Sequence, residues 1–152
     1  MLFRSKHLLA HERTNIADVN RAKCELERLK RIAKAEGVYD DLRFRDEIAK
    51  LEVDIVALEM LVLRVLSAEK SGKNSLDIAG LLKIKGSEIQ QTLTELMMLA
   101  VGTAAIPFQR DWINAGWQAQ APVAPWAIPL GAAYLNMRKT TDRKSTRLNS
   151  SH

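Results

Sequence analysis

Apolar residues recur at helical spacing in three separate stretches of the chain. Within each stretch they are three or four positions apart, or about twice that where a small or polar residue intervenes, which is typical of one buried helix face. The first and third stretches are followed by Gly37 and Gly102, placed where a C′ glycine ends a helix. The pattern predicts helices over about residues 7–36, 41–70 and 75–101.

The second stretch has the most regular pattern. Asp40 or Asp41 is placed to cap its N-terminus. Its seam steps alternately by four and three residues, as in helices packed at a shallow angle: Phe44, Ile48, Leu51, Ile55, Leu58, Val62 and Val65. Other apolar residues lie off this seam: Val53, Val56, Met60, Leu61 and Leu63. Because this helix is apolar around most of its circumference, we expect it to be central in the bundle and covered by neighbouring helices on several sides.

The third stretch contains two glycines inside the helical pattern. Gly80 and Gly86 each lower helix stability by about 1 kcal/mol relative to alanine, so we expect a packing reason such as close helix approach. The predicted buried face consists of Ile78, Leu82, Ile89, Leu93, Leu96 and Ala100.

The character of the chain changes over residues 104–130. All four prolines and all three tryptophans fall there, and aromatic residues among prolines more often hold a loop against a bundle than stack on nucleic-acid bases. A new helical pattern begins at residues 131–141 and is cut off within about three turns. The expected fold is all-α, an up-down antiparallel helical bundle in a single domain, with the fourth helix truncated.

Positive charge is concentrated at the end of the chain. The net charge of the 152 residues is +5, and residues 138–152 supply +4 of it, from three arginines and two lysines against Asp142. Residues 142–152 follow an interrupted helix and have no apolar periodicity, so we expect a disordered, non-native tail. We expect the same of residues 1–6. The positive charge of the tail is then not evidence of nucleic-acid binding.

Several classes of protein are disfavoured by the composition. The single cysteine, Cys24, cannot form an intramolecular disulfide, which fits a reducing cytoplasm. No apolar run is long enough to span a membrane or to serve as a secretion signal. His7 and His11 are one helical turn apart, but no third ligand completes a set, so we expect no metal site.

Glu12 and Arg13 lie ahead of the regular apolar stripe of the first helix. Taken alone, these two residues read as a solvated ion pair. A functional role is the alternative, which the local sequence taken alone favours less than the ion pair.

The motifs HERT, LKIKGSEIQQ and LNMRKTT occur in that order. In order and spacing, residues 7–141 resemble the C-terminal helical domain of bacterial acyl-CoA dehydrogenases. The resemblance implies a fragment of an FAD-dependent enzyme of fatty acid metabolism that oxidises an acyl-CoA thioester to the 2,3-enoyl-CoA. It also implies an electron-transfer flavoprotein as partner, and a homodimer or homotetramer of the intact enzyme.

The resemblance also implies roles for three residues. Some branches of the family place the catalytic carboxylate immediately before an arginine on the first helix of this domain, which makes Glu12 the base and Arg13 a neighbour of the CoA portion. Other members place the base just beyond the position of Thr141. Where relatives have a Gly-Gly pair against the flavin, this chain has Val101 and Gly102, so only Gly102 is implied to contact FAD.

Two alternative functions stay open. A basic helical module would bind nucleic acid or acidic membranes through residues 142–152, with an affinity that falls steeply with salt. A non-enzymatic bundle would self-associate through the apolar girth of the second helix, residues 44–66. A fragment of an acyl-CoA dehydrogenase without its companion domains could also self-associate. Self-association alone therefore does not distinguish such a fragment from a non-enzymatic bundle.

Overall fold

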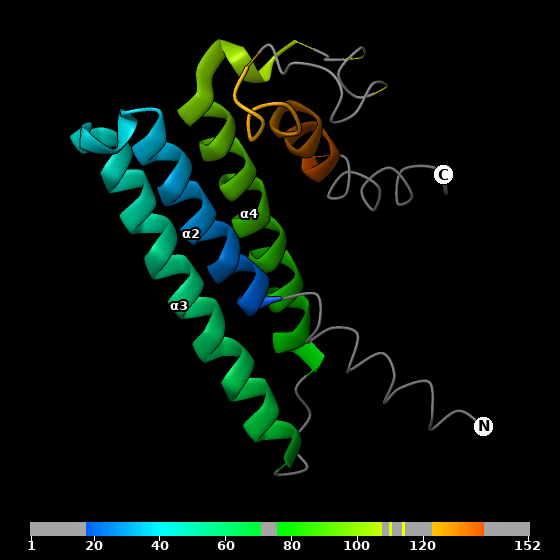
Figure 1. Cartoon of the computed structure of the whole chain (residues 1–152). Coiled ribbons are helices and arrows are strands. Elements are labelled where there is room, and N and C mark those ends of the chain that lie inside the picture. Colours follow the sequence, from blue (N-terminus) through cyan, green and yellow to red (C-terminus); the bar gives the residue numbers. More distant parts are fainter. Residues whose placement is uncertain (1–17, 71–75, 108–109, 111–113, 115–122, 139–152) are drawn as a thin grey trace, which may run out of the picture.

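The structure is a computed structural model in which three long helices run up, down and up (Figure 1). The helices are α2 (Val19–Ala35), α3 (Leu42–Lys70) and α4 (Leu76–Val101), and short 3₁₀ turns, η1 (Val38–Asp40) and η2 (Gly102–Ala105), follow α2 and α4. A further helix, residues 130–138, lies beside the upper part of α4. The structure describes residues 18–70, 76–107, 110, 114 and 123–138.

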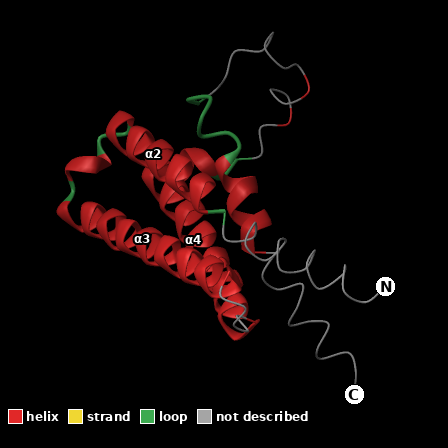
Figure 2. Cartoon of the chain, turned by 90° about the horizontal axis from the view of Figure 1, so that it is seen from below, coloured by secondary structure: helices red, strands yellow, loops and turns green. Residues whose placement is uncertain are grey.

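The described residues contain helices, turns and loops but no strand, and each long helix packs against the other two (Figure 2). This confirms the predicted all-α, up-down bundle. The observed bounds of α3 and α4 agree with the prediction to within one residue. The predicted first helix is described only from Val19 onward, and residues 1–17 and 139–152, with the predicted lead and tail, lie outside the described residues.

Short polar residues and glycine set the helix ends. The Asp18 carboxylate accepts a hydrogen bond of 3.2 Å from the Arg21 N–H at the start of α2. At the start of α3, the Asp41 carboxylate accepts one of 2.8 Å from the Arg43 N–H, so Asp41 is the cap of the two predicted candidates. Gly37, with a φ of 74°, takes the left-handed conformation that ends α2, as predicted.

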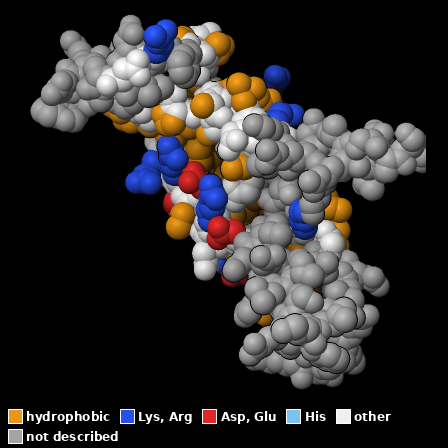
Figure 3. Space-filling view, turned by 90° about the vertical axis from the view of Figure 1, so that its right-hand side faces the viewer, with side chains coloured by type: hydrophobic (Ala, Val, Ile, Leu, Met, Phe, Trp, Pro, Cys, Tyr) orange, Lys and Arg blue, Asp and Glu red, His pale blue; other side chains and the backbone are white. Residues whose placement is uncertain are grey.

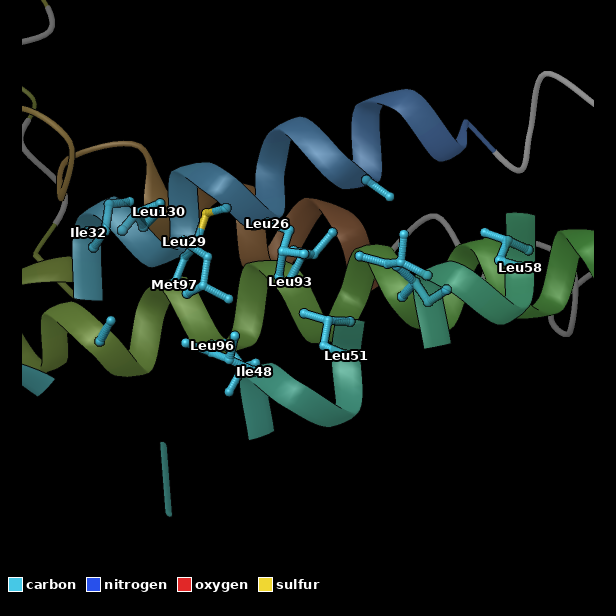
Figure 4. Close-up of a cluster of buried hydrophobic side chains, with 14 of the residues drawn as sticks. Leu26, Leu29, Ile32, Ile48, Leu51, Leu58, Leu93, Leu96, Met97 and Leu130 are labelled. Carbon is cyan, nitrogen blue, oxygen red and sulfur yellow. The ribbon is translucent and has the colours of Figure 1, made fainter. Parts of the chain in front are cut away.

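The core lies between the three long helices (Figure 4). Five of the seven predicted seam residues of α3 are buried, and the other two, Phe44 and Val62, are half-buried against the core. The largest fully buried side chains are Leu29 from α2, Leu51, Ile55, Leu58 and Val65 from α3, and Leu82, Leu93 and Met97 from α4. The periodicity therefore identified the packed face of each helix.

The predicted central position of α3 is wrong for the described bundle. Both α2 and α4 contact α3, but Val53, Val56, Met60 and Leu63 remain 68%, 51%, 53% and 53% exposed. In Figure 1, α3 lies at the edge of the bundle, with α2 beside it. The two neighbours share the buried side of α3 and leave its other apolar side uncovered.

The two glycines of α4 differ from each other. Gly86 is buried between Leu82 and Ile89, on the face that packs into the core, in agreement with the expected packing role. A Cβ at Gly80 would meet no atom within 4 Å, so the expected close helix approach is wrong for Gly80.

The segment after α4 is fastened back onto the bundle. Trp126 donates a 2.9 Å hydrogen bond from Nε1 to Glu36 at the end of α2, as expected of a tryptophan that holds the loop in place. Arg138 forms a 2.7 Å ion pair with Glu95 of α4. The start of helix 130–138 touches η2 so closely that a Cβ at Gly131 would collide with the Ala105 carbonyl oxygen.

Ion pairs line the α2–α3 contact. Lys23 pairs with Glu59 at 2.7 Å, and Lys30 pairs with Glu52 at 2.7 Å and with Glu27 at 2.9 Å. Hydrogen bonds to Glu52 and then to Glu27 raise the pKa of Lys30 above its ordinary value. The side of α2 next to α3 is therefore charged at its margin and apolar only at the core.

Candidate functional site

Of the three residues with implied roles, the structure describes Gly102 alone. Glu12 and Arg13 lie outside the described residues, as do His7 and His11. The candidate site is therefore built from the end of α4 outward, where Gly102 lies.

Gly102 marks the point where α4 changes into the 3₁₀ turn η2. Its φ of 65° lies in the left-handed region, which is strained for a residue with a side chain. Gly102 is exposed, and a Cβ there would meet no atom within 4 Å. The backbone conformation therefore requires the glycine, whereas crowding does not.

The chain immediately after Gly102 is well supported. The Ile106 N–H donates a 3.2 Å hydrogen bond to the Thr103 carbonyl oxygen, and the Ala105 side chain is 3% exposed. Because Gly131 approaches the Ala105 backbone so closely, helix 130–138 holds this corner from the other side. These contacts hold the turn that directly follows Gly102.

An apolar cavity of about 550 Å³ opens next to this corner, between the end of α4 and helix 130–138. Its lining is Met98, Ala105, Ile106, Pro107, Ile128, Pro129, Gly131, Ala132, Tyr134 and Leu135. Figure 3 shows this side of the molecule, where hydrophobic side chains gather in the upper part, above a band of charged side chains. The volume lies within the range of small-molecule sites in proteins.

The described lining of this cavity carries no carboxylate, histidine or thiol. Tyr134 is its one side chain with a polar group, and the Tyr134 ring lies 4.7 Å from the Arg138 guanidinium. The described lining is therefore suited to an apolar group, with the Tyr134 hydroxyl as its one polar side-chain group. The sequence pattern did not predict this cavity, because its prolines and apolar residues come from both sides of the tryptophan-rich segment and carry no local sign that the two sides pack together.

The perturbed titratable groups of the described chain lie elsewhere, in ion pairs on the helix surfaces. Lys30 lowers the pKa of Glu27, while Glu47 raises the pKa of Lys50 and Glu88 raises that of Lys85, in each case first through a hydrogen bond and then through charge. These pairs are one turn apart on exposed surfaces, which is a structural arrangement.

Two searches of the described residues gave negative results. No cluster of histidine, cysteine, aspartate and glutamate side chains could hold a metal ion. None of the described helices has the length and apolar character needed to cross a membrane.

Comparison with protein families gives one match. The family described as acyl-CoA dehydrogenase, C-terminal domain, matches residues 4–138 of the 152-residue chain. The chain belongs to this family, and its all-helical fold agrees with that membership. Searches of curated proteins and of solved structures found no match.

Proposed function

We propose that the chain serves as the C-terminal helical domain of a flavin-dependent acyl-CoA dehydrogenase, which oxidises an acyl-CoA thioester to the 2,3-enoyl-CoA. The observation that carries the proposal is the family match over residues 4–138. The order of the motifs HERT, LKIKGSEIQQ and LNMRKTT, which lie almost entirely within this match, agrees with it.

In the proposed reaction, the Glu12 carboxylate accepts the α proton of the acyl group. FAD, when bound, accepts the hydride that leaves the β carbon, so the substrate loses two electrons and gains a carbon–carbon double bond. A carboxylate can act as this base if an apolar, water-poor site raises its pKa toward working pH. The proposal therefore places Glu12 beside the acyl chain, away from bulk water.

Two further residues have supporting roles in the proposal. Arg13, adjacent to the base, carries a fixed positive charge suited to the phosphate-bearing CoA portion. Gly102 is proposed to lie against the flavin. Its open backbone and left-handed conformation support this role, because a side chain there would be strained and would occupy the space of the ring.

The proposed context follows from the same family. The substrate is an acyl-CoA of fatty acid metabolism, an electron-transfer flavoprotein accepts the electrons, and the intact enzyme is a cytoplasmic homodimer or homotetramer. Family membership supports an acyl-CoA substrate and oligomerisation in general terms.

The test of the base is the substitution Glu12→Gln in the complete flavoenzyme. We expect the variant to keep its flavin and nearly all of its acyl-CoA binding, and to lose about 100-fold to 10,000-fold in turnover. The readout is the rate at which an acyl-CoA bleaches the flavin under anaerobic conditions. Glu27→Gln, on the exposed surface of α2, is the matched control and should bleach at the normal rate.

Full activity of Glu12→Gln would contradict the assignment and move the base beyond Thr141. A separate measurement tests the need for companion domains. The 152-residue chain mixed with FAD and an acyl-CoA should give no flavin reduction, and measurable reduction would show that the chain alone holds a complete site.

A further inference from the structure

Helix 130–138 begins against the backbone of η2, the 3₁₀ turn whose first residue is Gly102. A Cβ on Gly131 would collide with the carbonyl oxygen of Ala105, the last residue of η2. Because this oxygen belongs to the backbone, no change of side-chain rotamer can make room for a larger residue. Any side chain at position 131 must therefore displace either helix 130–138 or η2.

Helix 130–138 is the firmer of these two elements. Leu130, at its start, is 2% exposed and lies in the hydrophobic core (Figure 4). The Ala133 N–H donates a 2.9 Å hydrogen bond to the Pro129 carbonyl oxygen, which holds the first turn of the helix. At the other end, Arg138 forms its 2.7 Å ion pair with Glu95 of α4. Displacement of this helix would pull Leu130 away from the core, which is the largest of these losses.

The turn η2 is the softer element, because it is joined to α4 through Gly102. This glycine is exposed, a Cβ there would meet no atom within 4 Å, and its backbone angles can change without a collision. Ile106, directly after η2, is 73% exposed, so its side chain does little to hold the turn. Crowding at position 131 is therefore relieved by rotation at Gly102, which moves the Gly102 backbone itself.

We infer that Gly131 is a positioning residue for the flavin, an inference that rests on the proposed contact between Gly102 and the flavin. Gly131 acts through η2. Because it has no side chain, helix 130–138 packs directly on the Ala105 backbone and holds the turn that contains Gly102. A functional site has to be held within about 0.5 Å of its working geometry, so a small displacement of η2 is enough to weaken flavin binding.

Thermal unfolding of the 152-residue chain tests the packing contact without flavin. Gly131→Ala should lower the melting temperature, because the new methyl group collides with the Ala105 carbonyl oxygen. Gly80→Ala is the matched control, since it makes the same change inside α4, where a Cβ would meet no atom within 4 Å. Its melting temperature should be equal to that of the native chain or higher. Equal melting temperatures for the two variants would overturn the inference.

Flavin binding by the complete flavoenzyme tests the function. The apo forms of the native and variant enzymes are titrated with FAD, and the absorption spectrum of the flavin is recorded at saturation. Gly131→Ala should raise the Kd of FAD roughly tenfold, as expected of local backbone strain at a binding site, and should shift the flavin absorption bands. Gly80→Ala should give the native Kd and the native spectrum.

A further control separates positioning from a general loss of stability. Leu58→Ala removes a buried side chain that lies far along the core from Leu130 (Figure 4). This variant should lower the melting temperature and leave both the Kd of FAD and the flavin spectrum unchanged. A rise in Kd for Leu58→Ala equal to that for Gly131→Ala would show that Gly131 has a structural role alone.

Gly102→Ala in the same titration distinguishes failure of this inference from failure of the proposed flavin contact. A raised Kd for Gly102→Ala but not for Gly131→Ala would overturn the positioning role and leave the flavin contact standing. Native Kd values for both variants would overturn the contact and the inference together. A raised Kd for Gly131→Ala alone would refute the route through Gly102.

Ala105→Gly is the second variant, for use if Gly131→Ala does not fold. It removes a methyl group that is buried in η2 and introduces no collision, so the turn is loosened while the bundle stays intact. We expect Ala105→Gly to raise the Kd of FAD. A native Kd for this variant would overturn the inference, because η2 would then not control flavin binding.

Discussion

The helices α2 and α3 pack side by side on one core, yet their outer sides differ. Outside its buried stripe, α2 presents mainly charged residues, and two of them, Lys23 and Lys30, form ion pairs with α3. Outside its own buried seam, α3 presents four exposed apolar side chains, those of Val53, Val56, Met60 and Leu63. In an amphipathic helix whose outer side is polar, one set of neighbouring helices covers all of the apolar surface. A helix with a second apolar side keeps apolar surface exposed for another contact.

The largest expected effect comes from the inner side of α3. Leu58→Ala should lower the free energy of unfolding by about 2–5 kcal/mol, because Leu58 is 1% exposed and its loss leaves a cavity between the helices. Leu63→Ala is the matched control on the outer side and should change monomer stability by less than about 0.5 kcal/mol. Urea unfolding at low protein concentration measures both.

Equal losses for these two variants would remove the distinction between the inner and outer sides of α3. A loss only for Leu63→Ala would mean that the side of α3 carrying Leu63 is the buried one.

A smaller effect is expected at the start of α3. Asp41→Ala should lower the free energy of unfolding by about 1 kcal/mol, because the Arg43 N–H loses its 2.8 Å hydrogen bond to the carboxylate. Asp41→Asn keeps an acceptor and should cost much less, whereas Asp40→Ala should be neutral if Asp41 is the sole cap. Thermal unfolding followed by circular dichroism distinguishes these variants.

The smallest effect is expected from the charged margin between α2 and α3. Lys30→Met should cost about 0.2–1 kcal/mol at pH 7, since it removes the pairs with Glu52 and Glu27. The raised pKa of Lys30 means that its contribution is complete below its ordinary value of 10.5 and is lost as the pH rises through the higher folded value.

Urea unfolding of the native chain and the Lys30→Met variant at neutral and strongly alkaline pH tests this sign. The difference between the two chains should shrink above pH 10.5. A difference that grows with pH would show that the Lys30 ammonium is destabilising.

Much of the fold could be predicted because it follows local rules. The bounds of α3 and α4, the glycine at the end of α2 and the Asp41 cap depend on spacing and backbone chemistry that the sequence displays directly. The candidate site was less accessible. Gly102 is confirmed as a left-handed helix terminus, but the cavity beside it joins segments about thirty residues apart and has no local signature.

The helices, their caps and the seam of α3 that enters the core follow from the sequence alone, since periodicity shows which residues share one side of a helix. The packing of both α2 and α4 on that seam, which leaves Val53, Val56, Met60 and Leu63 exposed, is visible in the folded molecule alone. Periodicity does not predict this arrangement. Apolar residues on two sides of a helix indicate that burial of both sides is favourable, but they do not indicate how many helices pack against it.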